Sequence, residues 1–271
     1  MFATFSRRVG VLAASCVVAT VAAALATVPH ETLTERLDRH LGPEPRLAHN
    51  ELRLPPPWGG SDPAPIPTPG QVAVCDGPGT EEVLTLPDSG APEGGRPLWV
   101  RRPPGPDSAD LPVLYLLHGS ASTHRTLMSE GIGELLDHQM CRSGIEFVIA
   151  APYGQEPWGS DTEWGDAAHG RFALESFVTG PVVEAVEGEH PRPRALRAVG
   201  GFSMGGYGAA ALALRNPALY SQVVSWAGYF RVDDPHGTFG DDPTPHSPDL
   251  LLGSEEVRDI RFMLVEGTDD H

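Results

Sequence analysis

One strand-turn-helix segment constrains the fold of this chain more than any other feature of its sequence. The stretch GGFSMGGYGAAALALRNP, Gly200 to Pro217, sets Ser203 between glycines. The run Ala195 to Gly201 predicts a strand, and the small residues from Gly206 to Arg215 predict a helix that ends at Asn216-Pro217. A serine at such a sharp turn has a strained backbone that only flanking glycines can accommodate. The segment therefore indicates an α/β fold with Ser203 as a candidate nucleophile.

Short apolar runs separated by helical stretches extend this segment into a larger βαβ pattern. Val113 to Leu117 is typical of a strand buried on both faces. Phe172 to Glu187 has helical composition, with Pro181 expected to kink or restart the helix. Tyr229 to Glu256, rich in Pro, Asp, Gly and His, is interpreted as an irregular insertion that covers a site. Further strands are predicted at Leu98 to Arg101, Glu146 to Pro152, Val223 to Gly228 and Ile260 to Gly267.

The N-terminal part of the chain has a different composition and predicts export. Arg7 and Arg8 precede the uncharged run Val9 to Val28, and Ala24-Leu25-Ala26 offers a cleavage site, so residues 1–26 are interpreted as a signal peptide. An uncleaved membrane anchor is the alternative, because the uncharged run could just span a bilayer. Residues 27–79 are rich in proline and glycine and predict a segment and linker without a core. The folded domain is expected to cover 80–271.

The charge balance argues against one class of partner. All 19 basic residues are arginine, and 36 acidic residues give a formal net charge of −17. Such an acidic chain repels phosphate backbones, so nucleic acid is not an expected partner. The absence of lysine also excludes a lysine nucleophile. After export, Cys75 and Cys141 would enter an oxidising compartment, where they either form a disulfide or remain two unrelated thiols.

Three blocks of sequence, in order, resemble one enzyme family. They are LPVLYLLHGS (Leu111 to Ser120), LESFVTGPVVEAVE (Leu174 to Glu187) and GFSMGGYGAA (Gly201 to Ala210). Together they resemble the putative-esterase family of the α/β-hydrolase superfamily, which includes S-formylglutathione hydrolase (esterase D), feruloyl and acetyl-xylan esterases, enterochelin esterase and the antigen 85 mycolyltransferases. The resemblance covers about Arg96 to His271. It implies an α/β-hydrolase fold with a mostly parallel central sheet, here expected to lack its C-terminal strand and histidine loop.

The resemblance assigns roles to residues around the turn. Ser203 matches the family's nucleophile, and the backbone N–H of Met204 matches one donor of the oxyanion hole. The second donor is the N–H after the family's H/D-G pair, which is Ser120 here. Two such preorganised donors stabilise the oxyanion of a tetrahedral intermediate by several kcal/mol. His118 is interpreted as a residue that orients this loop and does not act as the base.

The catalytic acid and base are sought after the last predicted strand, because α/β-hydrolases carry them in the order Ser, acid, His. Gly267 to Asp270 resembles the family's G-T-x-D block and places Asp270 at the acid position, with Asp269 as the close alternative. His271 is the base candidate, although a neighbouring aspartate cannot easily orient it. Asp269 or an acid from the insertion would then take that role. A C-terminally truncated domain is the simplest account of this difficulty.

Other residues with reactive or aromatic side chains are assigned smaller roles. Trp158 and Trp164 follow a predicted strand end and are candidates for lining a substrate cleft, or else for packing their own loop. Two further histidines, at 236 and 246, lie in the insertion and are weaker candidates for the base. With Asp241 and Asp242 they show no compact metal-ligand spacing, so neither a metal nor a cofactor is expected.

These features favour a secreted or cell-envelope serine esterase or acyltransferase. Its acyl-enzyme would form on Ser203, and its substrate would be an ester, with a cell-envelope lipid or a polysaccharide ester as candidates. Contact with a membrane is expected only if the signal is uncleaved. The alternative is a non-catalytic exported binding protein with a hydrolase fold, or an inactive fragment that lacks the catalytic histidine.

Overall fold

The computed structural model describes residues 77–267 with short gaps, which fall at 92–93, 105–107, 109, 121, 130–131, 157–160 and 235–236. The predicted signal peptide and nearly all of the predicted linker lie outside this part of the chain. So do five of the predicted site residues or their alternatives: Trp158, His236, Asp269, Asp270 and His271. No helix in the described part is long and apolar enough to cross a membrane.

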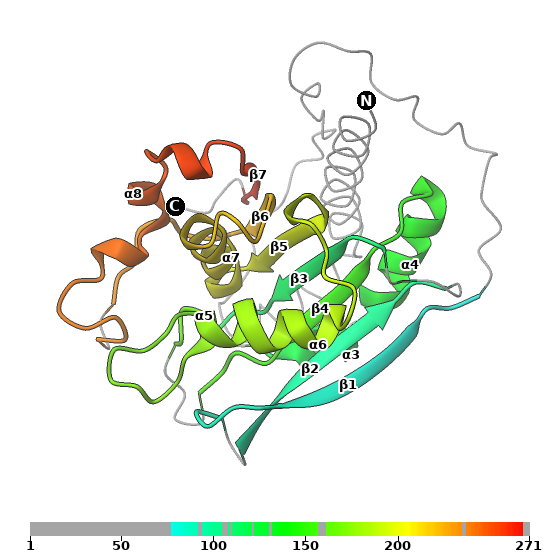
Figure 1. Ribbon diagram of the computed structural model, residues 1–271, viewed down its shortest axis with the longest axis horizontal. Coiled ribbons are helices and arrows are strands. Elements are labelled where there is room, and N and C mark those ends of the chain that lie inside the picture. The colour runs from blue at the N-terminus through cyan, green and yellow to red at the C-terminus, as the bar shows by residue number, and fades with distance from the viewer. Residues whose placement is uncertain are drawn as a thin grey trace, which may run out of the picture.

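A seven-stranded sheet organises the described part, with strand order β1-β2-β4-β3-β5-β6-β7. Figure 1 shows it running from β1 at one edge to β7 at the other. The first three strands in this order pair antiparallel, and the other pairs are parallel, which confirms the mostly parallel sheet. The strands are β1 (Thr80–Pro87), β2 (Gly95–Arg102), β3 (Val113–Leu117), β4 (Val148–Pro152), β5 (Arg197–Phe202), β6 (Gln222–Trp226) and β7 (Arg261–Val265).

The strand predicted from an apolar run at 113–117 is confirmed with the same bounds, and all five of its residues are buried. The first strand, in contrast, was not predicted. Its sequence, TEEVLTLP, is half polar, and most of its residues are exposed because it lies at the edge of the sheet. An edge strand buries too little surface to produce a continuous apolar run. The antiparallel edge is therefore the part of the sheet that the sequence signals least.

Helices cover both faces of the sheet, with α5, α6 and α7 in front of it in Figure 1. The helices are α3 (His124–Ser129), α4 (Ile132–Ser143), α5 (Leu174–Phe177), α6 (Val183–Glu187), α7 (Met204–Arg215) and α8 (Pro248–Leu251). A π-helical turn, Val178–Val182, joins α5 to α6 and contains Pro181. Proline lacks the N–H that an α-helix needs at this position, so the predicted interruption is confirmed.

Alternate residues of β3 supply two separate cores. Val113, Tyr115 and Leu117 belong to the core shared with the helices α5, α6 and α7. Leu114 and Leu116 belong to the core on the other face, which includes apolar side chains of α4. Successive side chains of a strand point to opposite faces, so a strand covered by helices on both faces must be apolar throughout. Cys141, also in α4, is disulfide-bonded; its predicted partner, Cys75, lies outside the described residues.

A buried ion pair joins α6 to the amino end of β5. Arg197 donates to both carboxylate oxygens of Glu187, each at 2.7 Å. The Tyr115 hydroxyl donates to the same carboxylate at 2.8 Å, and the backbone N–H of Arg192 donates at 2.6 Å. Every oxygen of this buried carboxylate therefore has a donor, as a charge removed from water requires. The opposite, carboxyl end of β5 leads into the candidate site.

Candidate active site

The turn between β5 and α7 holds Ser203 in a strained backbone conformation. Its φ and ψ angles are 55° and −119°, which residues other than glycine rarely adopt. The Ser203 N–H donates to the carbonyl oxygen of Trp226 at 2.8 Å, and its own carbonyl accepts from the Tyr207 N–H at 3.0 Å. Neighbouring elements thus fix the peptide groups on both sides of the serine. The sharp strand-to-helix turn that the sequence predicts at Ser203, here called the elbow, is present. The role of Ser203 as a nucleophile stays a prediction.

The glycines around the serine are required by close backbone contacts. A Cβ atom at Gly205 would lie 2.2 Å from the carbonyl oxygen of Leu117, at the end of β3. A Cβ atom at Gly201 would lie 2.5 Å from the carbonyl group of Gly205. Real Cβ atoms do not approach other atoms so closely, so any side chain at either position would push the elbow away from β3.

The loop that follows β3 lies directly beside the elbow. A Cβ atom at Gly119 would be 3.5 Å from the Cβ atom of Ser203 and 3.2 Å from the carbonyl oxygen of Phe202. Ser120 therefore directly follows a residue that lies close to the Phe202 carbonyl group and the Ser203 side chain. Met204 begins α7, and the first N–H groups of a helix have no acceptor within it. This geometry agrees with the two predicted oxyanion donors, which stay predictions.

His118 is bound to the backbone through both ring nitrogens. The Gly154 N–H donates to Nε2 at 2.9 Å, so Nδ1 carries the proton and donates to the carbonyl oxygen of Gly119, also at 2.9 Å. The side chain is buried, and burial lowers the pKa of His118 to about 4. A neutral imidazole with both nitrogens engaged cannot accept the serine proton. The interpretation that His118 orients the loop fits this arrangement.

Trp164 supports the same loop from beneath and does not face a cleft. Its side chain is 1% exposed, and its indole N–H donates to the carbonyl oxygen of His118 at 3.1 Å. Its ring meets the edge of the His118 ring at a centroid distance of 4.9 Å. A Cβ atom at Gly208 would lie 2.7 Å from Trp164, so α7 closes over it. The expectation that Trp164 lines a substrate cleft is therefore corrected, since a fully buried ring cannot touch substrate.

Sequence reasoning missed a carboxylate beside this tryptophan. Glu163 is 9% exposed and accepts a hydrogen bond from the Tyr229 hydroxyl. Burial raises the pKa of Glu163 to about 7, although the hydrogen bond from Tyr229 opposes this shift. The Tyr229 ring stacks on Tyr207 of α7 at 4.8 Å. Glu163 thus links the loop after β4 to α7 and to the start of the insertion, and nothing in its local sequence distinguishes it from a surface acid.

The predicted insertion is irregular but well bonded. The carboxylate of Asp234 accepts hydrogen bonds from the backbone N–H groups of Thr238 and Phe239, both at 2.7 Å. Phe239 stacks on the ring of His246 at 3.8 Å, and the Tyr207 hydroxyl donates to the carbonyl oxygen of His246 at 2.7 Å. Burial lowers the pKa of His246 to about 4. This histidine packs the insertion against α7 and is only partly exposed; its weaker candidacy as the base stays a prediction.

The acid and base candidates follow β7 in the sequence. In the sheet, β6 lies between β7 and β5, the strand that leads into the elbow. Phe202 pairs with Trp226, and Trp226 pairs with Val265 near the end of β7. Adjacent strands lie about 4.8 Å apart, so β7 ends about 10 Å from the elbow at the same edge of the sheet. Asp270 and His271 follow β7 in sequence but lie outside the described residues. Within the described residues, no group of three or more ligand side chains could hold a metal ion.

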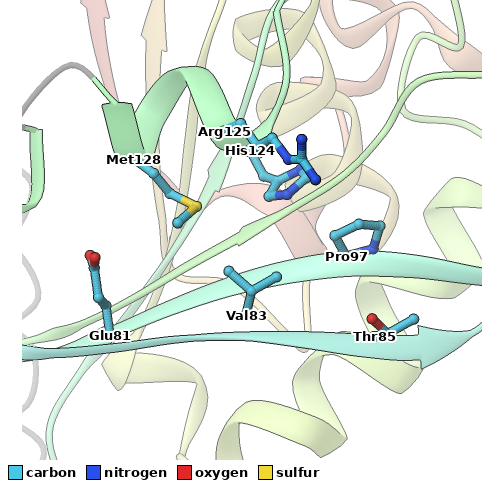
Figure 2. Close-up of a pocket in the computed structure, with 7 residues that line it drawn as sticks. All are labelled: Glu81, Val83, Thr85, Pro97, His124, Arg125 and Met128. Carbon is cyan, nitrogen blue, oxygen red and sulfur yellow. The ribbon is translucent and has the colours of Figure 1, made fainter.

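Figure 2 shows a groove elsewhere in the protein, between the antiparallel edge of the sheet and α3. It has a volume of about 560 Å³. None of its lining residues belongs to β5 or α7, so it is not the site around Ser203. The lining residues are Glu81, Val83, Thr85, Pro97, His124, Arg125 and Met128.

Comparison with known proteins places the chain in a family. A family model described as "Putative esterase" matches residues 89–271. The chain belongs to this esterase family. This member of the esterase family is 27% identical over 145 residues to the S-formylglutathione hydrolase of Mus musculus, covering 47% of this chain and 50% of that protein. A Rattus norvegicus S-formylglutathione hydrolase is 28% identical over 142 residues, or 46% of this chain and 49% of that protein. The chain thus spans about half the length of the curated relatives it matches.

Solved structures show the same fold as this esterase-family chain. The S-formylglutathione hydrolase of Agrobacterium tumefaciens superimposes with a TM-score of 0.59 and 19% identity, over 70% of this chain and 76% of that one. FphF, a fluorophosphonate-binding serine hydrolase of Staphylococcus aureus, superimposes with a TM-score of 0.57 and 21% identity, over 71% of this chain and 80% of that one. A ferulic acid esterase superimposes with a TM-score of 0.58 and 20% identity, over 71% of this chain and 80% of that one. Together with the sheet order, these similarities establish an α/β-hydrolase fold.

Proposed function

We propose that this chain is a secreted serine esterase or acyltransferase that acts on carboxylic esters through Ser203. The Ser203 Oγ atom attacks the ester carbonyl carbon, and its proton passes to the base. The tetrahedral intermediate then expels the alcohol, which recovers that proton, and leaves an acyl group on Ser203. Water or a second alcohol takes the acyl group in the reverse sequence. The observation that carries this proposal is the strained elbow, with its φ of 55°, beside the loop after β3.

The oxyanion that forms in each step is assigned to the N–H groups of Met204 and Ser120. The first belongs to the residue that begins α7, where unbonded helical N–H groups favour negative charge. The second belongs to the residue after Gly119, where an added Cβ atom would lie 3.5 Å from the Cβ atom of Ser203. Removing one such donor typically lowers kcat by about 10²–10³. Asp270 and His271 are proposed as acid and base, with Asp269 or an insertion carboxylate as the group that orients His271.

We propose the substrate class from the expected location of the protein, because export limits which esters it meets. The predicted signal peptide and the disulfide at Cys141 both suit an exported protein. The known relatives include S-formylglutathione hydrolases and a ferulic acid esterase. Export favours esters of the cell envelope or of polysaccharides over a cytosolic thioester. Hydrolysis and acyl transfer use the same site and differ only in which acceptor reaches the acyl-enzyme.

Fluorophosphonate labelling of the full-length purified chain, with mass spectrometry to locate the modified residue, tests the proposal. We expect Ser203 to be labelled and p-nitrophenyl acetate to be hydrolysed. Ser203→Ala should lower that turnover by at least about 10³-fold. Ser221→Ala is the matched control, because this serine lies at the opposite end of β5 and its hydroxyl donates only to the Arg197 carbonyl oxygen among the described residues. Turnover unchanged by Ser203→Ala, or a folded chain whose serines all resist labelling, would overturn the proposal.

A further inference from the structure

The side chain of Gln155, in the loop after β4, faces the carbonyl groups of the loop beside the nucleophile. Its amide nitrogen donates to the carbonyl oxygen of Ser120 and lies 3.4 Å from that of Gly119 and 3.3 Å from that of Ser122. One side-chain atom therefore meets three backbone oxygens of a single short loop. Only a donor is favourable in such a position, so the amide nitrogen and not the amide oxygen must point there.

The carbonyl group of Gly119 is held by further donors. It accepts from His118 Nδ1 at 2.9 Å and from the Ser122 N–H at 3.1 Å, in addition to Gln155. In a planar trans peptide the C=O of one residue and the N–H of the next point in opposite directions. Fixing the Gly119 oxygen on the His118 and Gln155 side therefore turns the Ser120 N–H toward the opposite side of the loop.

Gln155 has a rigid support of its own. Its backbone carbonyl accepts a hydrogen bond from Arg96 Nη1 at 2.8 Å, and the Arg96 side chain is completely buried. Arg96 is paired with Asp88 and also donates to the carbonyl oxygen of Gly90 at 3.2 Å. The preceding residue, Gly154, is bound on both sides, by His118 and by the Thr162 hydroxyl at 2.6 Å. The amide therefore projects from a fixed backbone.

We propose that Gln155 is a positioning residue of the esterase reaction, which orients the Gly119–Ser120 peptide so that the Ser120 N–H faces the oxyanion formed on attack by Ser203. This inference rests on the proposed function. Gln155 itself touches no reacting atom. Its role is to hold the carbonyl oxygens of the loop on its own side, which keeps the Ser120 N–H pointing the opposite way.

Gln155→Glu is the sharpest test, because it keeps the shape of the side chain and replaces the donor by an acceptor that faces three oxygens. We expect kcat for p-nitrophenyl acetate to fall about 30-fold, part of the loss caused by removing an oxyanion donor, while KM changes less than about 3-fold. Gln155→Met, which removes the donor without adding charge, should show a smaller fall in kcat. Gln139→Glu on α4 is the matched control for added charge and should leave kcat unchanged.

Amide hydrogen exchange separates this inference from the proposed function. In Gln155→Glu, the backbone N–H groups of residues 118–122 should exchange at least about tenfold faster, while those of α7 keep wild-type rates. A kcat within twofold of wild type in Gln155→Glu, or unchanged exchange in this loop, would overturn the inference. If the wild type has no turnover, the proposed function fails and exchange alone still decides whether Gln155 holds the loop. Should Gln155→Glu not fold, Gln155→Met provides the same two measurements.

Discussion

The backbone conformation of Ser203 is unfavourable by itself, and contacts with the rest of the fold maintain it. A non-glycine residue in such a region of φ and ψ loses on the order of 1–3 kcal/mol. The hydrogen bonds to Trp226 and Tyr207 and the close contacts of Gly201 and Gly205 leave the turn no relaxed alternative. The strain keeps the serine at the tip of the turn, where a substrate can reach it, instead of inside the first turn of α7.

Ser203→Gly should therefore stabilise the protein. Glycine removes the strain but gains freedom in the unfolded chain, so we expect a net rise of about 1 kcal/mol in the free energy of unfolding. Ser203→Ala should leave this free energy nearly unchanged, because alanine keeps the strained Cβ. Urea denaturation of the two variants and the wild type provides the comparison. A glycine variant no more stable than the alanine variant would show that the elbow is relaxed.

Sequence reasoning identified Ser203 because its signal is local. A serine between glycines, after an apolar strand and before a helix of small residues, has few other structural interpretations. Gln155 and Glu163 carry no comparable local signal, since their roles arise from contacts with Ser120 and Tyr229, distant in sequence. Trp164 was placed in the right region but on the wrong side of the loop, because sequence does not tell whether an aromatic ring packs or is exposed.

At the scale of elements, apolar composition decided which strands were predicted, including β7, whose residues are mostly not buried. The parallel strands β3 to β7 are apolar runs, and Pro181 marks the interruption between α5 and α6. The strand β1 and the helices α3 and α4 were not predicted from the sequence. The first is an exposed edge strand, and α4 has polar residues on much of its surface. Elements that bury only one face leave a weaker pattern than a strand covered on both faces.

The stability of the protein should depend strongly on the buried ion pair between Glu187 of α6 and Arg197 of β5. Burial by itself would raise the pKa of Glu187, but hydrogen bonds from Arg197, the Arg192 backbone and Tyr115 hold it below the ordinary value. Arg197→Ala leaves a buried, uncompensated carboxylate and should lower the free energy of unfolding by about 3–5 kcal/mol. The exposed pair Arg258–Glu255 provides the control, and Arg258→Ala should cost less than about 1 kcal/mol.

Chemical denaturation at pH 7 checks this prediction, and the double variant Arg197→Met with Glu187→Leu refines it. Replacing both charges by apolar side chains of similar volume should recover most of the lost stability. Equal effects of Arg197→Ala and Arg258→Ala would show that the α6–β5 pair contributes no more than a surface pair.

For the molecule as a whole, Glu163 connects three segments that are distant in sequence. Through Tyr229 it joins the loop after β4 to the insertion, and the Tyr229 ring stacks on Tyr207 of α7. Asp161 and Asp234 add negative charge nearby, which raises the pKa of Glu163 further, after the larger effect of burial. The packing of the insertion against α7 and the loop after β4 is therefore coupled to the protonation of the Glu163 carboxyl group.

This coupling predicts that stability falls as the pH rises. Because burial raises the pKa of Glu163 from 4.5 to about 7, the folded chain binds this proton more tightly than the unfolded chain does. The stabilisation is complete below pH 4.5 and is lost as the pH rises through about 7. Glu163→Gln should therefore be more stable than the wild type at pH 8, by up to about 3 kcal/mol, and nearly equal to it at pH 4.5.

Thermal melts of the wild type and Glu163→Gln across this pH range check the prediction. The difference between the two isolates Glu163, because His118 and His246 titrate identically in both proteins. Asp259→Asn, which removes an exposed charge that does not contribute to the shift of Glu163, is the matched control. A constant difference in melting temperature from pH 4.5 to pH 8 would contradict the proposed shift.

The crowded glycines of the elbow also bear on how this protein can change through evolution. A Cβ atom would lie 2.2 Å from its nearest neighbour at Gly205, 2.5 Å at Gly201, 2.8 Å at Gly206 and 2.7 Å at Gly208. Any missense change in a glycine codon adds a side chain, so these four positions offer no neutral route. Phe202, which is 47% exposed between them, is under no such packing constraint. Substitutions beside Ser203 should therefore be tolerated at Phe202 far more readily than at these four glycines.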